Sequence, residues 1–345
     1  MKAYTLSTSQ LFPWLDALMR SAEVVAPQRV GDDTFFAALR KPGDIFLAYT
    51  NTLEPPKRIF YPQVDTLLRA STNGRLEVTP VYDDTERVLF GVRSCDVSAI
   101  RYLDRVFSAD LPDIYYLGRR ERSAIISLAC NQPVERCFCI CADAGPFLAA
   151  GFDIQLTDLG DRYLAEVATE KGERLVAAAP QAFGPATQSD LEERQQLEET
   201  SRNSFAEPRS HFASAMRRMS GDRVAKELWT EMGEWCFGCG GCNHICPTCY
   251  CFTVTDETAG RECVRCRSWD SCQYAGFTRE ASGHNPRPGQ GDRQKRRFFH
   301  KLSYQYCQKN DDQHGCVGCG RCITVCLGRN DMPAVAEAIR RGAWA

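Results

Sequence analysis

The stretch CFGCGGCNHICP, residues 236–247, decides the fold of the C-terminal part of this chain. It places four cysteines in the order C-x2-C-x2-C-x3-C, at Cys236, Cys239, Cys242 and Cys246. The spacing occurs once more, at Cys316, Cys319, Cys322 and Cys326. The copies differ after the last cysteine, where the first has Pro247 and the second has Leu327. Two copies of one cysteine spacing indicate two equivalent sites.

This spacing is the one with which bacterial ferredoxins bind two 4Fe–4S clusters. Three thiolates on a tight loop reach three irons of one cubane, and the following helix carries the fourth thiolate to the other cluster. The predicted ligand sets are therefore crossed: Cys236, Cys239, Cys242 and Cys326 for the first cluster, and Cys316, Cys319, Cys322 and Cys246 for the second. Glycines inside both loops let backbone N–H groups approach the cluster sulfurs.

A structural zinc site is the alternative for such a motif. Structural zinc has four ligands, commonly two C-x2-C pairs separated by a loop. Zinc does not require a further cysteine three residues after the third one, and here that cysteine is present twice. The spacing therefore favours iron–sulfur clusters.

Composition agrees with metal or redox chemistry rather than with disulfides. The chain has 345 residues, enough for two or three domains, and nineteen of them are cysteine, an odd number. Its 42 basic and 44 acidic residues provide no general attraction to nucleic acid. The first residues contain no apolar run typical of a secretory signal, and no apolar stretch is long enough for a membrane span. We expect a cytoplasmic protein with reduced thiols.

The N-terminal part has the pattern of an α/β domain. Apolar runs at 44–49, 87–92 and 124–129 predict buried strands. Residues 96–107, between the second and third run, have apolar side chains at helical spacing, with Asp96 as the expected N-cap. A strand, a helix and a strand in this order predict a βαβ unit with parallel strands.

Four cysteines of this part predict a third cluster. Cys95 follows the second predicted strand and Cys130 follows the third, so both thiols leave the carboxyl ends of parallel strands, where open α/β sheets bind ligands. Cys137 and Cys139 come within reach of the same edge, and Cys141 is a spare that could replace Cys139. The alternative is a set of buried free thiols, because cysteine is often buried.

Six further cysteines lie between the two copies of the ferredoxin motif. Cys249, Cys251 and Cys272 could hold another metal or only line this insert, Cys263 and Cys266 form a weaker pair, and Cys307 is the sixth. The basic segment at 291–304 contains several aromatic residues. Compensation of cluster charge is the favoured interpretation of this segment, ahead of partner docking, an exposed face and nucleic-acid contact.

The predicted architecture is an α/β domain with parallel strands followed by an α+β dicluster ferredoxin-like domain. Residues 153–169 predict two more strands around a turn, and an amphipathic helix is expected at 222–235. The expected ranges are 1–175 for the α/β domain, 176–235 for a helical connector, and 236–345 for the dicluster domain with its insert at 247–315.

Several motifs in register give the chain a family resemblance. They are GVRSCDVSAIRYLDRVF, AC-x6-CFC with a following GP, CGGCNHICPTCYCF, SWDSC, SGHNPRP and CVGCGRC, spread over residues 87–330. Together they resemble the beta subunit of sulfhydrogenase-type NiFe hydrogenases, to which an iron–sulfur subunit of anaerobic sulfite reductase is homologous. Seven cysteines outside the ferredoxin motifs match the pattern: Cys95, Cys130, Cys137, Cys139, Cys249, Cys251 and Cys272. Cys141, Cys263 and Cys266 do not belong to it.

The resemblance implies a chain that passes electrons between two partner subunits, one that binds flavin and NAD(P) and one that holds the NiFe catalytic centre. The chain itself would have no catalytic centre. It contains no G-x-G-x-x-G dinucleotide motif, which agrees with this role. The alternative from the same class is the sulfite reductase subunit. Those from other classes are a stand-alone iron–sulfur enzyme and a zinc-stabilised scaffold.

The crossed ligation generates a first prediction. Replacing Cys326 with alanine should damage the cluster held by Cys236, Cys239 and Cys242, because the fourth ligand comes from the other motif. EPR spectra of the reduced variant, compared with those of Cys246→Ala, measure which cluster is lost. Loss of only the cluster on Cys316, Cys319 and Cys322 in the Cys326 variant would contradict the crossed scheme.

Overall fold

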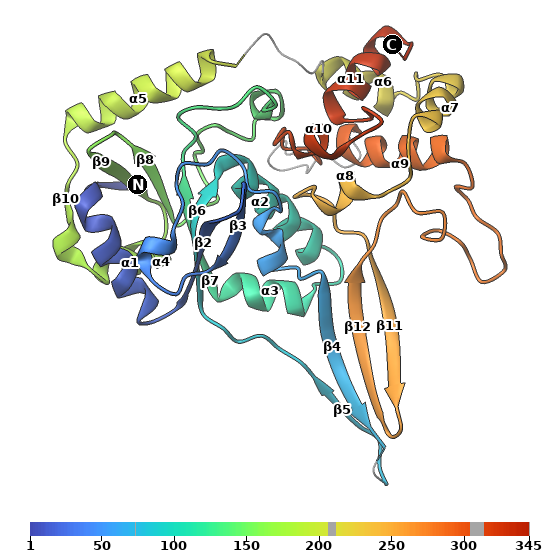
Figure 1. Cartoon of the computed structure of the whole chain (residues 1–345), viewed down its shortest axis with the longest axis horizontal. Coiled ribbons are helices and arrows are strands. Elements are labelled where there is room, and N and C mark those ends of the chain that lie inside the picture. The colour runs from blue at the N-terminus through green and yellow to red at the C-terminus, as the bar shows by residue number, and fades with distance from the viewer. Residues whose placement is uncertain (73, 206–211, 304–313, 345) are drawn as a thin grey trace.

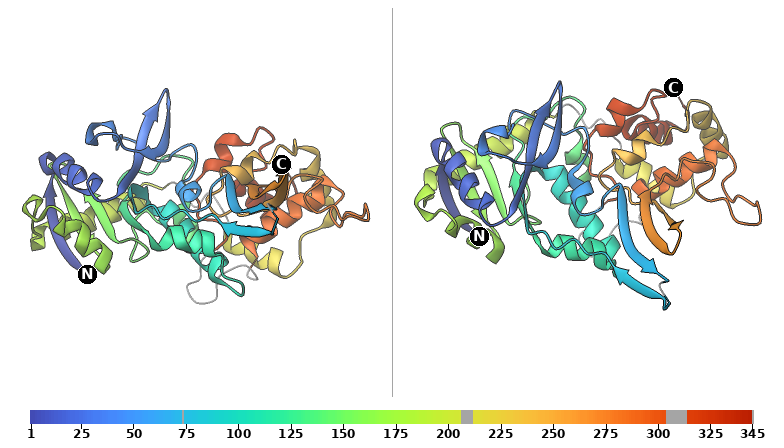
Figure 2. Two further views of the ribbon diagram at one scale, coloured as in Figure 1. Left: turned by 90° about the horizontal axis from the view of Figure 1, so that it is seen from below. Right: turned by 60° about the horizontal axis from the view of Figure 1, so that its bottom comes forward.

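The computed structural model describes residues 1–72, 74–205, 212–303 and 314–344 (Figure 1). It contains a large sheet, a smaller sheet that projects from the body, and a group of C-terminal helices (Figure 1). The large sheet and the C-terminal helices lie at opposite ends of the molecule (Figure 2). Within the described residues, no helix is both long and apolar enough to cross a membrane.

The large sheet is mixed and has eight strands in the order β10-β1-β9-β8-β7-β6-β2-β3. The four central strands β8, β7, β6 and β2 are parallel, and the flanking strands pair antiparallel. The strands are β1 (Lys2–Ser7), β2 (Glu23–Val30), β3 (Asp33–Ala38), β6 (Arg87–Arg93), β7 (Ser123–Leu128), β8 (Ile154–Asp158), β9 (Arg162–Val167) and β10 (Phe183–Pro185).

Helices cover both faces of this sheet. On one face α1 (Leu11–Met19) and α4 (Glu170–Ala177) pack in a core with Phe90 and Ile126. On the other face α2 (Ser94–Ser108) and α3 (Ile114–Glu121) pack in a core with Leu89 and Ile125. Neighbouring strand residues thus face opposite cores, as the two-residue period of a strand requires. Short 3-10 turns complete this part: η1 (Thr8–Gln10), η2 (Pro42–Asp44), η3 (Pro56–Ile59), η4 (Cys139–Ala142) and η5 (Pro180–Ala182).

The expected βαβ unit is confirmed, because β6 and β7 are parallel and α2 lies between them. The two strands expected within 153–169 are confirmed as β8 and β9, and they pair antiparallel. The strand expected at 44–49 is wrong. β2 pairs with β6 only up to Val25, and beyond that point Phe46 N–H donates to the carbonyl of Pro27. The segment is apolar because Ile45 and Leu47 pack on the core, not because it belongs to the sheet.

The expected N-cap of α2 is also wrong. The helix begins at Ser94 with Arg93 as its N-cap residue, and Asp96 lies within the first turn. An acidic residue is favourable there because the helix dipole is positive at this end. The Asp96 side chain instead binds Arg321, a residue 225 positions away in the chain.

The smaller sheet joins two distant parts of the chain. Its order is β11-β12-β4-β5, all antiparallel. It pairs β4 (Val64–Ser71) and β5 (Glu77–Pro80) with β11 (Phe252–Ala259) and β12 (Glu262–Trp269) of the insert. Its base is held by the buried carboxylate of Asp65, which accepts hydrogen bonds from Arg119 at 2.5 and 3.0 Å and from Arg267 at 2.9 Å.

The C-terminal helices pack around one core. The exposed helix α5 (Gln188–Asn203) leads to α6 (Phe212–Ser220), α7 (Lys226–Glu234), α8 (Gly241–His244), α9 (Gln290–Leu302), α10 (Arg321–Val325) and α11 (Met332–Arg341). Helix α7 confirms the amphipathic helix expected at 222–235. The core includes Phe138 and Cys139 from the N-terminal half. Strand β10 follows residue 175 in the chain but still extends the large sheet, so the two halves of the chain are interleaved. The domain ranges 1–175, 176–235 and 236–345 stay predictions.

The Asp65 contacts generate a stability prediction. Replacing Asp65 with alanine leaves the guanidinium groups of Arg119 and Arg267 without their shared carboxylate in a buried place, so unfolding should become easier by about 3–5 kcal/mol. Chemical denaturation measures this change. Asp256→Ala is the matched control, because Asp256 pairs with Arg265 on the same small sheet in an exposed position and should change stability little. Equal effects of both changes would contradict the prediction.

Candidate metal centres

The two ferredoxin motifs have the same backbone conformation. Gly238 and Gly318 occupy equivalent positions with φ of 65° and 63°, and Gly240 and Gly320 have φ of 71° and 77°. These are left-handed conformations that glycine adopts without strain. Each loop then runs into a short helix, α8 or α10. The sequence repeat is therefore also a structural repeat.

Four cysteines predicted to bind one cluster line one small enclosed cavity. They are Cys316, Cys319 and Cys322 of the second loop and Cys246 of the first motif. Phe138, Arg297, Lys301 and Arg321 are among the other residues of its wall. Burial raises the pKa of Cys319 to about 11 and that of Cys322 to about 12, so as free thiols these groups would be neutral. Because Cys246 of the first motif lines the same cavity as three cysteines of the second motif, the cavity supports the predicted crossed ligation.

The other predicted set is Cys236, Cys239, Cys242 and Cys326. Burial raises the pKa of Cys242 to about 11, and the neighbouring Cys326 and Cys236 raise it as well, while Arg297 lowers it. N–H donors point at the sulfurs of this set: Gly238 N to Cys236 at 3.4 Å, Gln290 Nε2 to Cys236 at 3.1 Å, and Asn330 N to Cys326 at 3.2 Å. Hydrogen bonds of this kind adjust the reduction potential of a bound cluster.

The four N-terminal cysteines also meet at one cavity. Cys95 enters from the start of α2, Cys130 from the end of β7, and Cys137 and Cys139 from the loop that follows. The parallel pairing of β6 with β7 brings the first two together at the carboxyl edge of the sheet. Burial raises the pKa of Cys95 and Cys139 well above the ordinary thiol value. Cys141 is not among the residues that line this cavity.

This N-terminal site is in contact with the second ferredoxin loop. Cys319 lines both cavities. Phe138 N–H donates to the carbonyl of Gly318 at 2.9 Å, and Asn51 Nδ2 donates to the carbonyl of Cys319 at 2.6 Å. A Cβ atom on Gly318 would lie 2.5 Å from the carbonyl oxygen of Phe138, so the two backbones touch directly. Two of the three cysteine sites thus share a wall.

Several buried cations face these sulfurs, among them Lys57, Arg297 and Lys301. Lys57, Arg297 and Lys301 are 2%, 3% and 5% exposed, and none has a carboxylate partner in the described part of the chain. Lys57 Nζ donates to the carbonyls of Cys246 and Cys249 at 2.8 and 2.9 Å, and Lys301 Nζ donates to Thr248. Burial lowers the pKa of Arg297, but the negative charge that Cys242 and Cys322 carry when deprotonated outweighs this effect and raises it.

A buried charge without a counter-ion costs several kcal/mol. Clusters bound by four thiolates are anionic and would provide the missing negative charge. The residues present therefore fit 4Fe–4S clusters at these sites. Arg297 and Lys301 belong to the basic segment at 291–304, which favours the interpretation that this segment compensates cluster charge.

The insert cysteines divide into two thiol contacts. Cys249 lies against Cys246, and Cys251 lies against Cys272. Asn243 Nδ2 also donates to Cys272 Sγ at 3.0 Å. A further metal at Cys249, Cys251 and Cys272 stays a prediction. Cys263 and Cys266 lie on β12 opposite Ala70 and Thr66, and Cys307 lies outside the described residues.

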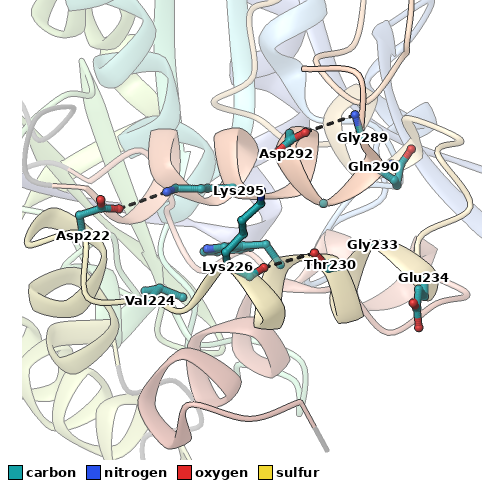
Figure 3. A pocket seen from close by; sticks show the side chains of 12 residues that line it. Asp222, Val224, Lys226, Thr230, Gly233, Glu234, Gly289, Gln290, Asp292 and Lys295 are labelled. Atoms are coloured by element: carbon teal, nitrogen blue, oxygen red, sulfur yellow. Dashed lines mark hydrogen bonds and ion pairs between the residues drawn. The ribbon is translucent and has the colours of Figure 1, made fainter. Parts of the chain in front are cut away.

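A cavity larger than the two cysteine cavities lies elsewhere, in an open groove between α7 and α9 (Figure 3). Lys226, Lys295 and Asp222 line one end, with an ion pair of 3.1 Å between Lys295 and Asp222. Gln290, which donates to Cys236, lines the groove at the end near Glu234 (Figure 3). In the described part of the chain, cysteines line the two small enclosed cavities and not this groove.

Sequence reasoning missed Asn51, Lys57 and Arg321, three residues that the fold brings to the cysteine sites. Asn51 lies in a loop and Lys57 in the turn η3, and neither segment contains a motif, so no sequence signal marked them. Arg321 lies between two predicted ligands, in the sequence CGRC, and its position inside the motif was the one available signal.

The contact at Gly318 generates a prediction. Gly318→Ala should strain the loop and push it away from Phe138, so iron content and thermal stability should both fall. Gly238→Ala is the matched control. It has the same φ to within a few degrees, but its Cβ would meet only the flexible side chain of Gln290, at 3.3 Å. Equal iron loss in the two variants would show that backbone strain alone, not the contact with Phe138, matters.

Two comparisons show which known proteins this chain is similar to. A family model described as a 4Fe-4S dicluster domain matches residues 235–329, which confirms the dicluster domain predicted from the cysteine spacing. Sulfhydrogenase 2 subunit beta of Pyrococcus furiosus is 33% identical over 343 residues, 98% of this chain and 99% of that protein. The resemblance inferred from the sequence motifs is thereby confirmed. This chain is an iron–sulfur protein that belongs to the family of sulfhydrogenase beta subunits.

Proposed function

We propose that this chain is the electron-transfer subunit of a cytoplasmic sulfhydrogenase complex. It relays electrons between two partner subunits, one that binds flavin and NAD(P) and one that holds the NiFe catalytic centre, and it has no catalytic centre of its own. The observation that carries the proposal is the series of three cysteine sites, in which Cys319 lines both the second ferredoxin cavity and the N-terminal cavity. A series of adjoining redox centres is what a relay requires.

The proposed ligands follow the three sites. The first cluster is held by Cys236, Cys239, Cys242 and Cys326, the second by Cys316, Cys319, Cys322 and Cys246, and the third by Cys95, Cys130, Cys137 and Cys139. Each cluster, when bound, takes up and releases single electrons. The chain itself buries Cys95, Cys139 and Cys319 and partly buries the other cysteines of the second and third sites, and it places cations beside the sulfurs.

Electrons can enter or leave at the first site. Among the described cysteines, Cys239 alone is exposed. Trp235 and Phe237 beside it in the chain are 60% and 75% exposed. An exposed cluster edge suits electron exchange with a partner subunit, whereas a substrate-converting site would require a pocket at the cluster.

The similarity to a sulfhydrogenase subunit supports a hydrogenase complex over the alternative, the homologous iron–sulfur subunit of an anaerobic sulfite reductase. A zinc-stabilised scaffold is disfavoured because two complete ferredoxin sets are present. A stand-alone enzyme is disfavoured for the same reason, since neither set lacks a ligand and so neither leaves an iron open.

Iron content tests the number of clusters. The full chain, reconstituted anaerobically with iron and sulfide, should hold about twelve irons, because each cubane contains four. Cys130→Ser should reduce the value to about eight. Cys141→Ser, a change four residues from Cys137 but outside the N-terminal cavity, should leave it at about twelve. About eight irons in the unchanged chain would remove the third cluster from the proposal.

Turnover tests the relay role. The reconstituted chain should accept electrons from dithionite, visible as bleaching of its brown colour, without oxidising hydrogen or reducing NAD(P) or sulfite. Co-purified partner subunits should restore turnover, and removal of the clusters by an iron chelator should abolish it again. Sustained turnover by the chain alone would overturn the proposal.

A further inference from the structure

A buried ion pair connects the N-terminal cysteine site with the second ferredoxin loop. Arg321 Nη1 and Nη2 donate to the two carboxylate oxygens of Asp96 at 2.6 and 2.8 Å. The side chains are 3% and 1% exposed. Such a two-pronged contact between a guanidinium and a carboxylate is geometrically specific as well as strong.

Two further donors of Arg321 are also engaged. Nε donates to the carbonyl of Thr52 at 2.9 Å, and Nη2 donates to its hydroxyl at 3.0 Å. The guanidinium is therefore held in one position. A buried ion pair is weak evidence for stability, because desolvation of both charges offsets their attraction. Its location suggests another purpose.

Each charge of the pair lies next to a different predicted cluster. Asp96 directly follows Cys95 in the chain, and Arg321 lies between Cys319 and Cys322. Arg321 lines the cavity of the second ferredoxin site. Asp96 lies in the first turn of α2, the helix that brings Cys95 to the N-terminal site. The pair therefore acts as a dipole, negative towards the N-terminal site and positive towards the second ferredoxin site.

We propose that the Asp96–Arg321 pair sets the difference in reduction potential between the third and the second cluster. Negative charge beside a cluster disfavours the added electron and positive charge favours it, so the pair makes the N-terminal cluster the stronger reductant. Electron transfer from the third cluster to the second is thereby favoured. This inference rests on the proposed function, since it requires both clusters to be present.

The test is a redox titration of the full, reconstituted chain followed by EPR, with three variants. Asp96→Asn should move the N-terminal cluster to a more positive potential, and more than it moves the second cluster. Arg321→Gln should move the second cluster to a more negative potential, and more than the N-terminal cluster. The double variant should bring the two potentials closer together than in the unchanged chain.

Several controls separate tuning from structural damage. The cluster on Cys236, Cys239, Cys242 and Cys326 should keep its potential in every variant. Arg321→Lys keeps the positive charge and should largely restore the second potential even where stability is lost. Asp65→Asn weakens a buried ion-pair group away from the cysteine cavities and should lower stability without shifting any potential.

The outcomes are distinguishable from failure of the proposed function. With about twelve irons bound, unchanged potentials in Asp96→Asn and Arg321→Gln, or shifts of the same sign in both, would overturn the inference and leave the relay intact. About eight irons in the unchanged chain would mean that the third cluster is absent, which would overturn the inference together with that part of the proposed function.

Discussion

The direct contact between the second ferredoxin loop and the N-terminal cysteine loop is the constraint on which the arrangement depends. The backbones of Gly318 and Phe138 meet without an intervening side chain, since any Cβ at Gly318 would collide with the Phe138 carbonyl. This approach lets Cys319 line two cavities at once. It also explains why Phe138 and Cys139, which follow a strand of the N-terminal sheet, belong to the core of the C-terminal helices. The two halves of the chain act as one body around the cysteines.

Charge is arranged around the cysteines in two different ways. Lys57, Arg297 and Lys301 are buried without carboxylate partners in the described residues, so their compensation has to come from the cysteine sulfurs and what these bind. Arg321 has a carboxylate partner, Asp96, and the pair has no net charge. The unpaired cations favour the binding of an anionic cofactor in general. The Asp96–Arg321 pair, which has no net charge, instead makes the N-terminal site differ from the second ferredoxin site. Metal binding and folding are expected to be coupled in a protein of this kind, because sites without clusters would leave buried cations uncompensated.

The small sheet extends the interleaving of the two halves. β4 precedes most of the large sheet in the chain, whereas β12 lies between the two ferredoxin motifs, yet the two strands are paired along most of their length. Asp65, Arg119 and Arg267 come from three elements and close the base of this sheet. The insert between the motifs is therefore not only a carrier of additional cysteines. Part of it completes a sheet begun by the N-terminal half and ties the ferredoxin region to the α/β region a second time.

Local sequence determined the features that depend on short-range periodicity and spacing. The cysteine repeat predicted two equivalent loops, and the left-handed glycines at 238 and 318 give both loops one conformation. The apolar runs predicted β6 and β7, and the rule for parallel strands placed Cys95 and Cys130 at one edge. The strand predicted at 44–49 is wrong because a loop whose apolar side chains pack on a core can have the same composition as a buried strand. Tertiary structure alone decided that Arg321 meets Asp96, that Lys57 reaches the Cys246 carbonyl, and that the second ferredoxin loop touches the N-terminal site. The first two of these contacts join residues 225 and 189 positions apart in the chain. No local pattern encodes such contacts, because a long-range contact depends on how whole elements pack.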